Sequence, residues 1–196
     1  MKNGILRNEL FVCDHLGTSA HDEKDIMGFS VGHPSGTGLV NYLRYHAFPD
    51  ENIGNMRTYM VRDVRTDELA CYFSLKAGLI SVNEVLTENG IEFDTLPGVE
   101  LANFAVNDTY IKNHRNLKGL GSIIFTDFVV PIIESSSDKI GIRIIYLFTL
   151  PETDLIQQYE KNYGFARLEK KAEDELHRRL KPGYDESCIF MYQSLK

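Results

Sequence analysis

The 196-residue sequence lacks the cysteine arrangements that stabilise small secreted domains or hold zinc. Its three cysteines, Cys13, Cys71 and Cys188, are odd in number, far apart and without CxxC spacing, which excludes a disulfide framework and a zinc knuckle. We therefore expect them to be small buried hydrophobic residues. None of the six histidines belongs to an HxxxH or HExxH pattern, so the sequence predicts no metal site.

The sequence also lacks long hydrophobic runs, internal repeats and low-complexity segments. No stretch approaches the roughly 18 consecutive apolar residues of a membrane span, and Arg7, Glu9 and Asp14 interrupt the N-terminal apolar residues, so no signal-peptide core is predicted. We expect one domain over residues 1–196, cytoplasmic and without membrane contact. The net charge of −7 makes nucleic acid an unlikely partner, because affinity for phosphate backbones depends on Lys and Arg.

Hydrophobic periodicity predicts alternating strands and helices. Pro131 is expected to kink its helix or end it early, and no structure is predicted for residues 81–98. The order implies an α/β or α+β fold with one mixed sheet. The predicted strands are 10–13, 57–64, 68–78, 99–107, 140–150, 164–169 and 187–195, and the predicted helices are 39–48, 119–135, 151–161 and 169–181.

The segment NHRNLKGLGSIIF (113–125) combines basic residues, two glycines one residue apart and an apolar helical run. A Walker loop requires Lys directly after the second glycine, but Ser122 follows Gly121. A dinucleotide fingerprint requires a third glycine where Ile124 stands. The remaining hypothesis is a loop whose backbone N–H groups, at the start of a helix, bind the pyrophosphate of coenzyme A.

Two motifs resemble those of the GNAT N-acetyltransferases. The family's Gln/Arg-x-x-Gly-x-Gly/Ala loop is matched by the segment 116–121, Asn-Leu-Lys-Gly-Leu-Gly, which follows Phe104-Ala105-Val106. It departs from the pattern in its first residue, Asn116, and in a connection several residues longer after Val106. The family's Tyr-Glu-Lys-x-Gly-Phe run is matched by residues 159–165, with one extra residue before Gly164.

The resemblance implies a GNAT acyl-CoA N-acyltransferase fold, a mixed central sheet with splayed middle strands flanked by helices. It implies acetyl-CoA as cofactor, with the pantetheine arm between the splayed strands 99–107 and 140–150, bonded to the backbone near residues 104–106. The implied coenzyme-binding residues are Phe104, Ala105, Val106, Arg115, Asn116, Leu117, Lys118, Gly119, Leu120, Gly121 and Ser122.

The resemblance also implies two catalytic residues. Tyr159 matches the tyrosine that protonates the departing thiolate of coenzyme A, although Tyr163 stays open as the matching position because of the extra residue. If the insertion lies at the helix end, with Asn162 left-handed, Tyr159 keeps its register. Glu100 lies five residues before Ala105, at a spacing that resembles that of a general-base glutamate.

The acceptor is not set by the fold. The first hypothesis is an N-acetyltransferase acting by direct attack of a primary amine of a small molecule or a protein. The second is a toxin-type member that acetylates aminoacyl-tRNA, because Pro97, Leu101 and Phe104-Ala105-Val106 resemble the corresponding strand of those toxins. The third is a non-catalytic acyl-CoA-binding module. A homodimer is left open.

Overall fold

The computed structural model describes residues 5–88, 90–180 and 187–195, with the backbone alone for residues 82–87 and 90–93. The chain forms two compact units. Unit 1 contains residues 1–76 and 101–132, and unit 2 contains residues 77–100 and 133–196. Among the described residues the strands follow the sheet order β1-β2-β3-β4-β5-β6-β8-β7. The predicted mixed sheet with helices is therefore confirmed.

Unit 1 contains the antiparallel half of the sheet. The first two strands, β1 (Leu6–Arg7) and β2 (Phe11–His15), pair with each other, and β2 pairs with β3 (Arg57–Asp63). In turn β3 pairs with the start of β4 (Leu69–Thr87), with a register shift between Val61 and Arg62. The end of β5 (Gly90–Val106) completes this half. The predicted strands at 57–64, 68–78 and 99–107 are confirmed.

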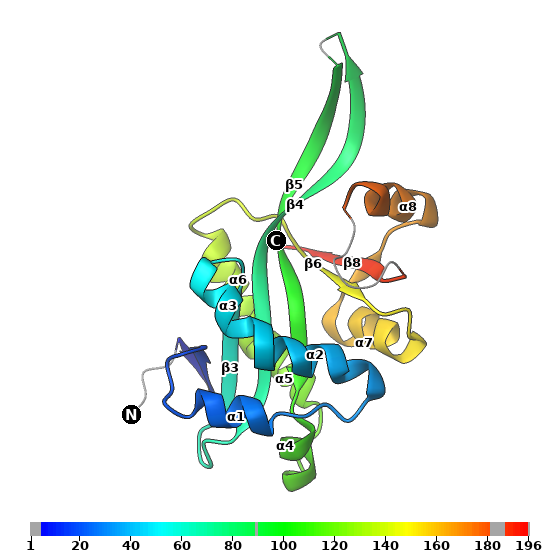
Figure 1. The fold of residues 1–196 in the computed structure, drawn as a ribbon. Helices are drawn as coiled ribbons and strands as arrows, with labels where there is room; N and C mark the ends of the chain where they lie inside the picture. Colours follow the sequence, from blue (N-terminus) through cyan, green and yellow to red (C-terminus); the bar gives the residue numbers. More distant parts are fainter. Residues whose placement is uncertain (1–4, 89, 181–186, 196) are drawn as a thin grey trace. The chain divides into compact units, whose positions relative to one another are not determined.

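The helices of unit 1 lie mostly between β2 and β3 and after β5 (Figure 1). The helices between β2 and β3 and the sheet share a core built from Leu16, Ile26, Phe29, Leu43, Ala47, Met60, Leu69, Tyr72 and Ala105. The helical segments are α1 (Asp22–Gly28), η1 (Pro34–Gly36), α2 (Thr37–Asn41), η2 (Tyr42–His46), α3 (Ala47–Ile53), α4 (Asp108–Asn113), α5 (Leu120–Ile124), η3 (Phe125–Val129) and α6 (Val130–Ser137), the last of which continues into unit 2.

Two π-helical turns, η2 and η3, each lie just before a proline. Pro49 follows η2, and Pro131 follows η3. Proline has no N–H for the carbonyl four residues earlier, and its ring crowds the preceding turn, so a wider turn is a local solution. Contrary to the expectation of an early end, the helix continues past Pro131 to Ser137. The predicted helix at 39–48 likewise extends through the sequence from Thr37 to Ile53.

The helix from Leu120 to Ser137 is, in the described part of the chain, the one helix long and apolar enough by length and composition to cross a membrane. It is not a run of consecutive apolar residues, because Asp127 and Glu134 interrupt it. Asp127 accepts a hydrogen bond of 2.8 Å from Asn8, and Ile124 and Phe128 are fully buried. Packing within the protein therefore accounts for its apolar residues.

Unit 2 combines a hairpin with a second group of strands and helices. Residues 81–98 were left without a prediction; their described parts, 81–88 and 90–98, belong to the long β4–β5 hairpin (Figure 1). The middle of β5, from Gly98 to Glu100, pairs in parallel with β6 (Ile144–Thr149). Strand β8 (Ile189–Ser194) lies antiparallel between β6 and β7 (Ala166–Arg167). Two helices complete the unit, α7 (Thr153–Tyr163) and α8 (Lys170–Arg179). The predicted helix at 151–161 begins and ends two residues later than expected.

Glycine at position 78 makes room for the buried ring of Tyr146. A Cβ built on Gly78 would lie 2.7 Å from Tyr146 Cζ and closer still to its hydroxyl, and one on Gly98 would lie 3.1 Å from Tyr146 Cδ1. The ring is 3% exposed and stacks on Phe190 at 5.7 Å. Two strand positions therefore lack side chains where the tyrosine lies across them.

We expect Gly78→Ala to destabilise the protein by about 1–3 kcal/mol, because the added methyl overpacks a buried contact. The midpoint of urea unfolding measures this. Gly141→Ala is the matched control in the same unit, since a Cβ there meets nothing within 4 Å. In proteins that also carry Tyr146→Leu, the urea midpoints with Gly and with Ala at position 78 should be nearly equal. Equal midpoints for Gly78→Ala and Gly141→Ala would contradict the packing argument.

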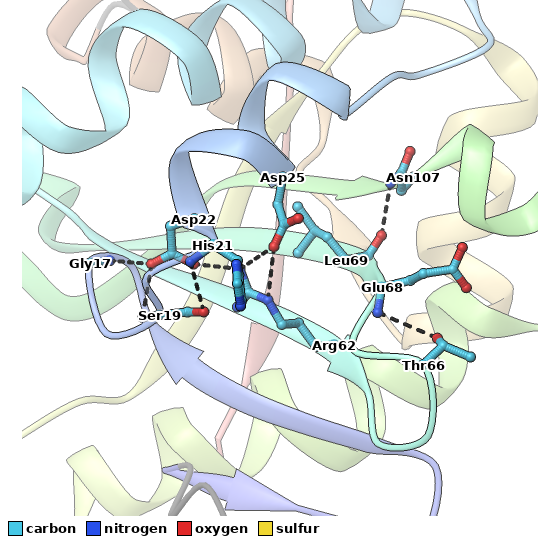
Figure 2. Close-up of polar contacts among 10 residues, drawn as sticks. All are labelled: Gly17, Ser19, His21, Asp22, Asp25, Arg62, Thr66, Glu68, Leu69 and Asn107. Atoms are coloured by element: carbon cyan, nitrogen blue, oxygen red, sulfur yellow. Dashed lines mark hydrogen bonds and ion pairs between the residues drawn. The ribbon is translucent and has the colours of Figure 1, made fainter.

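A buried ion-pair cluster joins α1 to β3 in unit 1, and the sequence analysis did not identify it. Arg62 is 1% exposed, and its guanidinium contacts the carboxylates of Asp22 and Asp25 (Figure 2). Asp22 also accepts hydrogen bonds from the backbone N–H groups of Gly17, at 2.7 Å, and Ser19, at 3.3 Å. The cluster therefore fixes both α1 and the turn that precedes it.

Candidate functional site

The end of β5 contains the first three predicted coenzyme-binding residues. Phe104 and Val106 are half-buried and Ala105 is 4% exposed. The buried Asn107 then ends the strand: its side-chain amide donates to the carbonyl of Leu69 at 2.8 Å, and its backbone N–H donates to the carbonyl of Ala70 (Figure 2). These bonds hold the strand end against β4.

The extra residues between Val106 and the glycines form the short helix α4. Asn107 caps this helix, since its side-chain oxygen accepts a hydrogen bond of 3.2 Å from the N–H of Thr109. The same oxygen accepts from the N–H of Ser30 at 3.3 Å. The departure from the family pattern is thus an ordered insertion tied to neighbouring elements, not an extended loop.

The glycine loop has the geometry that an anion-binding turn requires. Gly119 is left-handed, with φ 70° and ψ 24°, and directly precedes the helix that begins at Leu120. A Cβ there would meet nothing within 4 Å, so glycine is favoured by conformation rather than by space. The first N–H groups of the helix, on Leu120, Gly121 and Ser122, have no intrahelical acceptors. This is the predicted arrangement for binding a pyrophosphate.

The chain segment that leads into this turn is basic. Lys112, Arg115 and Lys118 fall between residues 109 and 126, where no carboxylate occurs. A surface hollow of about 240 Å³ is lined by Asn113, His114, Arg115, Asn116 and Leu117. The side chains of Arg115, Asn116 and Lys118 are exposed. All of the predicted coenzyme-binding residues lie in unit 1.

Tyr159 and Tyr163 differ in accessibility within unit 2. Tyr163 is 4% exposed, and its hydroxyl accepts a hydrogen bond of 2.9 Å from Gln158. Tyr159 is half-buried, with its ring edge-on to Tyr163 at 5.5 Å and to Phe165 at 5.6 Å. Of the two positions left open by the sequence, Tyr159 is thus the more accessible.

The extra residue of the Tyr-Glu-Lys run lies in a wide last turn of α7. The carbonyl of Tyr159 accepts hydrogen bonds from the N–H groups of both Gly164 and Phe165, five and six residues later. Gly164, with φ 71°, is the left-handed residue, whereas Asn162 remains helical. The expectation for Asn162 was therefore wrong. Glycine bears no steric penalty in this conformation, so it ends the helix instead.

Glu100 has an unexpected partner in Tyr146. The two residues face each other in the parallel β5–β6 ladder, at its last recorded pair, and the tyrosine hydroxyl is hydrogen-bonded to the carboxylate. Burial, together with the charge and hydrogen bond of Glu100, raises the pKa of Tyr146. The phenol therefore keeps its proton and acts as the donor. Glu100 is half-buried, and sequence reasoning missed its partner because Tyr146 is 46 residues away.

The other predictions can be placed from the same structure. Cys13, Cys71 and Cys188 are free and buried, which confirms the expected hydrophobic role. Both β5 and β6 continue beyond their last recorded pair, to Val106 and Thr149. The recorded β5–β6 ladder consists of three parallel pairs, from Gly98–Ile144 to Glu100–Tyr146.

The mixed sheet and its flanking helices match the GNAT fold of solved toxin structures. No family model matches the sequence, and no curated protein matches it. Among solved structures, the chain is similar to one described as a bacterial toxin, with a TM-score of 0.65 and 16% identity over 94% of this chain and 90% of that one.

Two further similar structures contain the AtaT toxin. One is a tyrosine-to-phenylalanine mutant bound to the C-terminus of the antitoxin AtaR, with a TM-score of 0.63 and 16% identity over 94% of this chain and 92% of that one. The other is AtaT complexed with acetyl-methionyl-tRNAfMet, with a TM-score of 0.60 and 16% identity over 92% and 93%. Others are AtaTR bound with AcCoA and a KacTA–DNA complex. The expectation that nucleic acid is an unlikely partner finds no support among these neighbours.

Proposed function

We propose that the chain is an acetyl-CoA-dependent N-acetyltransferase. The observation that carries the proposal is the left-handed Gly119, which opens an 18-residue helix directly after a basic connection. The AtaTR structure bound with AcCoA supports the choice of coenzyme. We further propose that the protein is cytoplasmic, as expected from the sequence.

The residues of unit 1 fit the coenzyme. The N–H groups of Leu120, Gly121 and Ser122 would bind the pyrophosphate, because the helix N-terminus favours anions. Arg115 and Lys118 would neutralise phosphate charge, with Asn116 and Leu117 as the intervening backbone. The backbone of Phe104, Ala105 and Val106 would bond to the pantetheine arm in the manner of an added strand. The coenzyme supplies an acyl group activated as a thioester.

The chain's own groups account for the proton transfers. In the proposal, the Glu100 carboxylate accepts a proton from the acceptor ammonium, which frees the amine for direct attack. A backbone N–H near Val106 polarises the acyl carbonyl. Tyr159 donates its phenolic proton to the departing thiolate, and both groups are weak acids of similar range. The second proton that the nitrogen loses as the amide forms restores the phenol. No covalent intermediate on the protein is required.

Among acceptors, we favour the α-amino group of an aminoacyl-tRNA over the amine of a small molecule or a protein. Support comes from the AtaT complex with acetyl-methionyl-tRNAfMet. The acidity of the chain is concentrated rather than general: five carboxylates and no basic residue fall between residues 77 and 100, so most of the net charge of −7 belongs to that segment. The rest of the chain is close to neutral.

The first experiment tests coenzyme binding by thermal shift. A non-hydrolysable acetyl-CoA analogue at 100 times its Kd should stabilise the protein by about 2.7 kcal/mol, which corresponds to roughly 5–10 °C in Tm for a chain of this size. Gly119→Ala should reduce the shift, because a left-handed alanine costs about 1–2 kcal/mol. Gly38→Ala is the matched control, since a Cβ there meets nothing within 4 Å.

The second experiment identifies the acceptor. Acetylation of charged tRNA, falling steeply with added salt, supports the tRNA hypothesis. Thiol release with simple amines but not with charged tRNA supports the hypothesis that the acceptor is a primary amine of a small molecule or a protein. Coenzyme binding with no turnover for any acceptor supports an acyl-CoA-binding module. If no analogue changes the Tm, the proposed function fails.

A further inference from the structure

The inserted helix α4 is tied by three side chains to the turn between β3 and β4. The Tyr110 hydroxyl donates to Asp63 Oδ2 at 2.6 Å, and Asn113 Nδ2 donates to Glu68 Oε1 at 3.1 Å. His114 Nε2 lies 2.6 Å from Glu68 Oε2. Residues 110, 113 and 114 are spaced by three and four, so they share one side of the helical turn. We call these five residues the α4 clamp.

The β3–β4 turn is itself ordered enough to serve as an anchor. Asp63 Oδ1 accepts hydrogen bonds from the N–H groups of Arg65 and Thr66, at 2.7 and 3.1 Å. The Asp63 N–H donates to the carbonyl of Glu68 at 3.0 Å, and Thr66 accepts from the Glu68 N–H (Figure 2). Both carboxylates of the clamp therefore project from a closed turn.

Charge strengthens the clamp at neutral pH. The hydrogen bond from His114 is the main cause that lowers the pKa of Glu68. Burial raises the pKa of Asp63, but the bonds from Tyr110, Arg65 and Thr66 outweigh this and lower it. Burial and the bond to Asp63 raise the pKa of Tyr110. Both carboxylates are thus ionised acceptors, and the Tyr110 hydroxyl keeps its proton; hydrogen bonds to ionised acceptors are strong.

The clamp lies directly before the phosphate loop in the chain. Tyr110 is 2% exposed, and the ring of His114 stacks on it at 4.1 Å. The carbonyl of His114 accepts from the N–H of Leu117 at 2.9 Å, so the held histidine also begins the loop. Four residues, 115–118, separate His114 from Gly119. The clamp therefore shortens the free connection between Val106 and the glycines to these four residues.

We infer that Glu68 and Asp63 are positioning residues that hold the phosphate loop in its binding conformation. The inference rests on the proposed function, since the loop's ligand is coenzyme A. Neither carboxylate needs to contact the coenzyme. A free insertion would lose conformational entropy on binding, and a loop ordered in advance does not incur that cost. In this pairing the Glu68 carboxylate faces His114.

The test replaces Glu68 with alanine and measures coenzyme A binding by calorimetry. We expect Kd to rise about tenfold, as for the loss of one charge-assisted hydrogen bond, with kcat at saturating coenzyme unchanged. Glu68→Gln keeps one acceptor and should give an intermediate Kd. Arg57→Gln, which removes an exposed ion pair with Glu51 elsewhere in unit 1, is the matched control and should leave Kd unchanged.

A second measurement separates this inference from the proposed function. Hydrogen exchange of the Leu117 and Ile123 N–H groups, both bonded to carbonyls of the loop, should accelerate in Glu68→Ala without coenzyme. If the wild-type protein binds no coenzyme, the proposed function fails. The hydrogen-exchange rates then still test whether the α4 clamp orders the loop. Wild-type exchange rates in Glu68→Ala would overturn the inference, as would an unchanged Kd. A general fall in Tm with uniformly faster exchange would also overturn it, because it would indicate a structural role only.

Discussion

Replacing Tyr159 with phenylalanine should lower kcat by about 10²–10⁴-fold, the usual contribution of a general acid. The ring would keep its edge-on contacts with Tyr163 and Phe165, and only the hydroxyl would be lost. The affinity for acetyl-CoA should therefore stay unchanged. Steady-state kinetics on an acceptor found by the screen, together with calorimetric Kd values, measure both quantities.

Tyr163→Phe is the matched control, because it removes a hydroxyl from the same helix. That hydroxyl is bonded to Gln158 in a buried setting, so its loss should cost about 1 kcal/mol of stability with little change in kcat. The reverse result, a large loss in Tyr163→Phe and none in Tyr159→Phe, would move the general acid to Tyr163. It would also refute the interpretation that the wide last turn of α7 accommodates the insertion.

Replacing Asp22 with alanine should destabilise the protein by about 3–5 kcal/mol, the usual cost of removing one partner from a buried ion pair. Arg62 would keep Asp25, whose side chain is 20% exposed, as its remaining partner. The N–H groups of Gly17 and Ser19 would also lose their acceptor. This is a large share of a typical stability of about 5–15 kcal/mol. The urea midpoint measures the change.

Two variants make the Asp22 prediction specific. Lys170→Ala removes an ion pair whose partners are 87% and 58% exposed, and such pairs contribute about 0–1 kcal/mol. The double variant Asp22→Leu/Arg62→Met should recover much of the lost stability, because apolar side chains of similar size often replace buried ion pairs well. A midpoint for Asp22→Ala as high as that of Lys170→Ala would show that the cluster does not stabilise the fold.

The sequence predicted the elements whose signals are local. Runs rich in β-forming residues predicted β3 and the start of β4, and the helix predicted at 169–181 is α8 (Lys170–Arg179). The glycine spacing marked the turn at Gly119 before any fold was known. These features depend on residues within a few positions of one another, which the sequence shows directly.

The elements it missed depend on distant partners. The short helices α1 and α4 have seven and six residues, too few to be stable through helix propensity alone. One is held by Arg62, 40 residues from Asp22, and the other by Asp63 and Glu68 through Tyr110 and His114. The outer part of the β4–β5 hairpin gave no clear period, so its strands were not predicted.

By itself, the sequence determined the order of the main elements and the glycine loop, and it left two tyrosines as candidates for the general acid. The tertiary structure decided which tyrosine is accessible, which carboxylate Tyr146 faces and where the inserted helix is held. The physical reason is the range of the interactions. Helix periods, strand alternation and glycine conformations act over a few residues, whereas a buried charge or phenol is stabilised by whichever group the fold brings beside it.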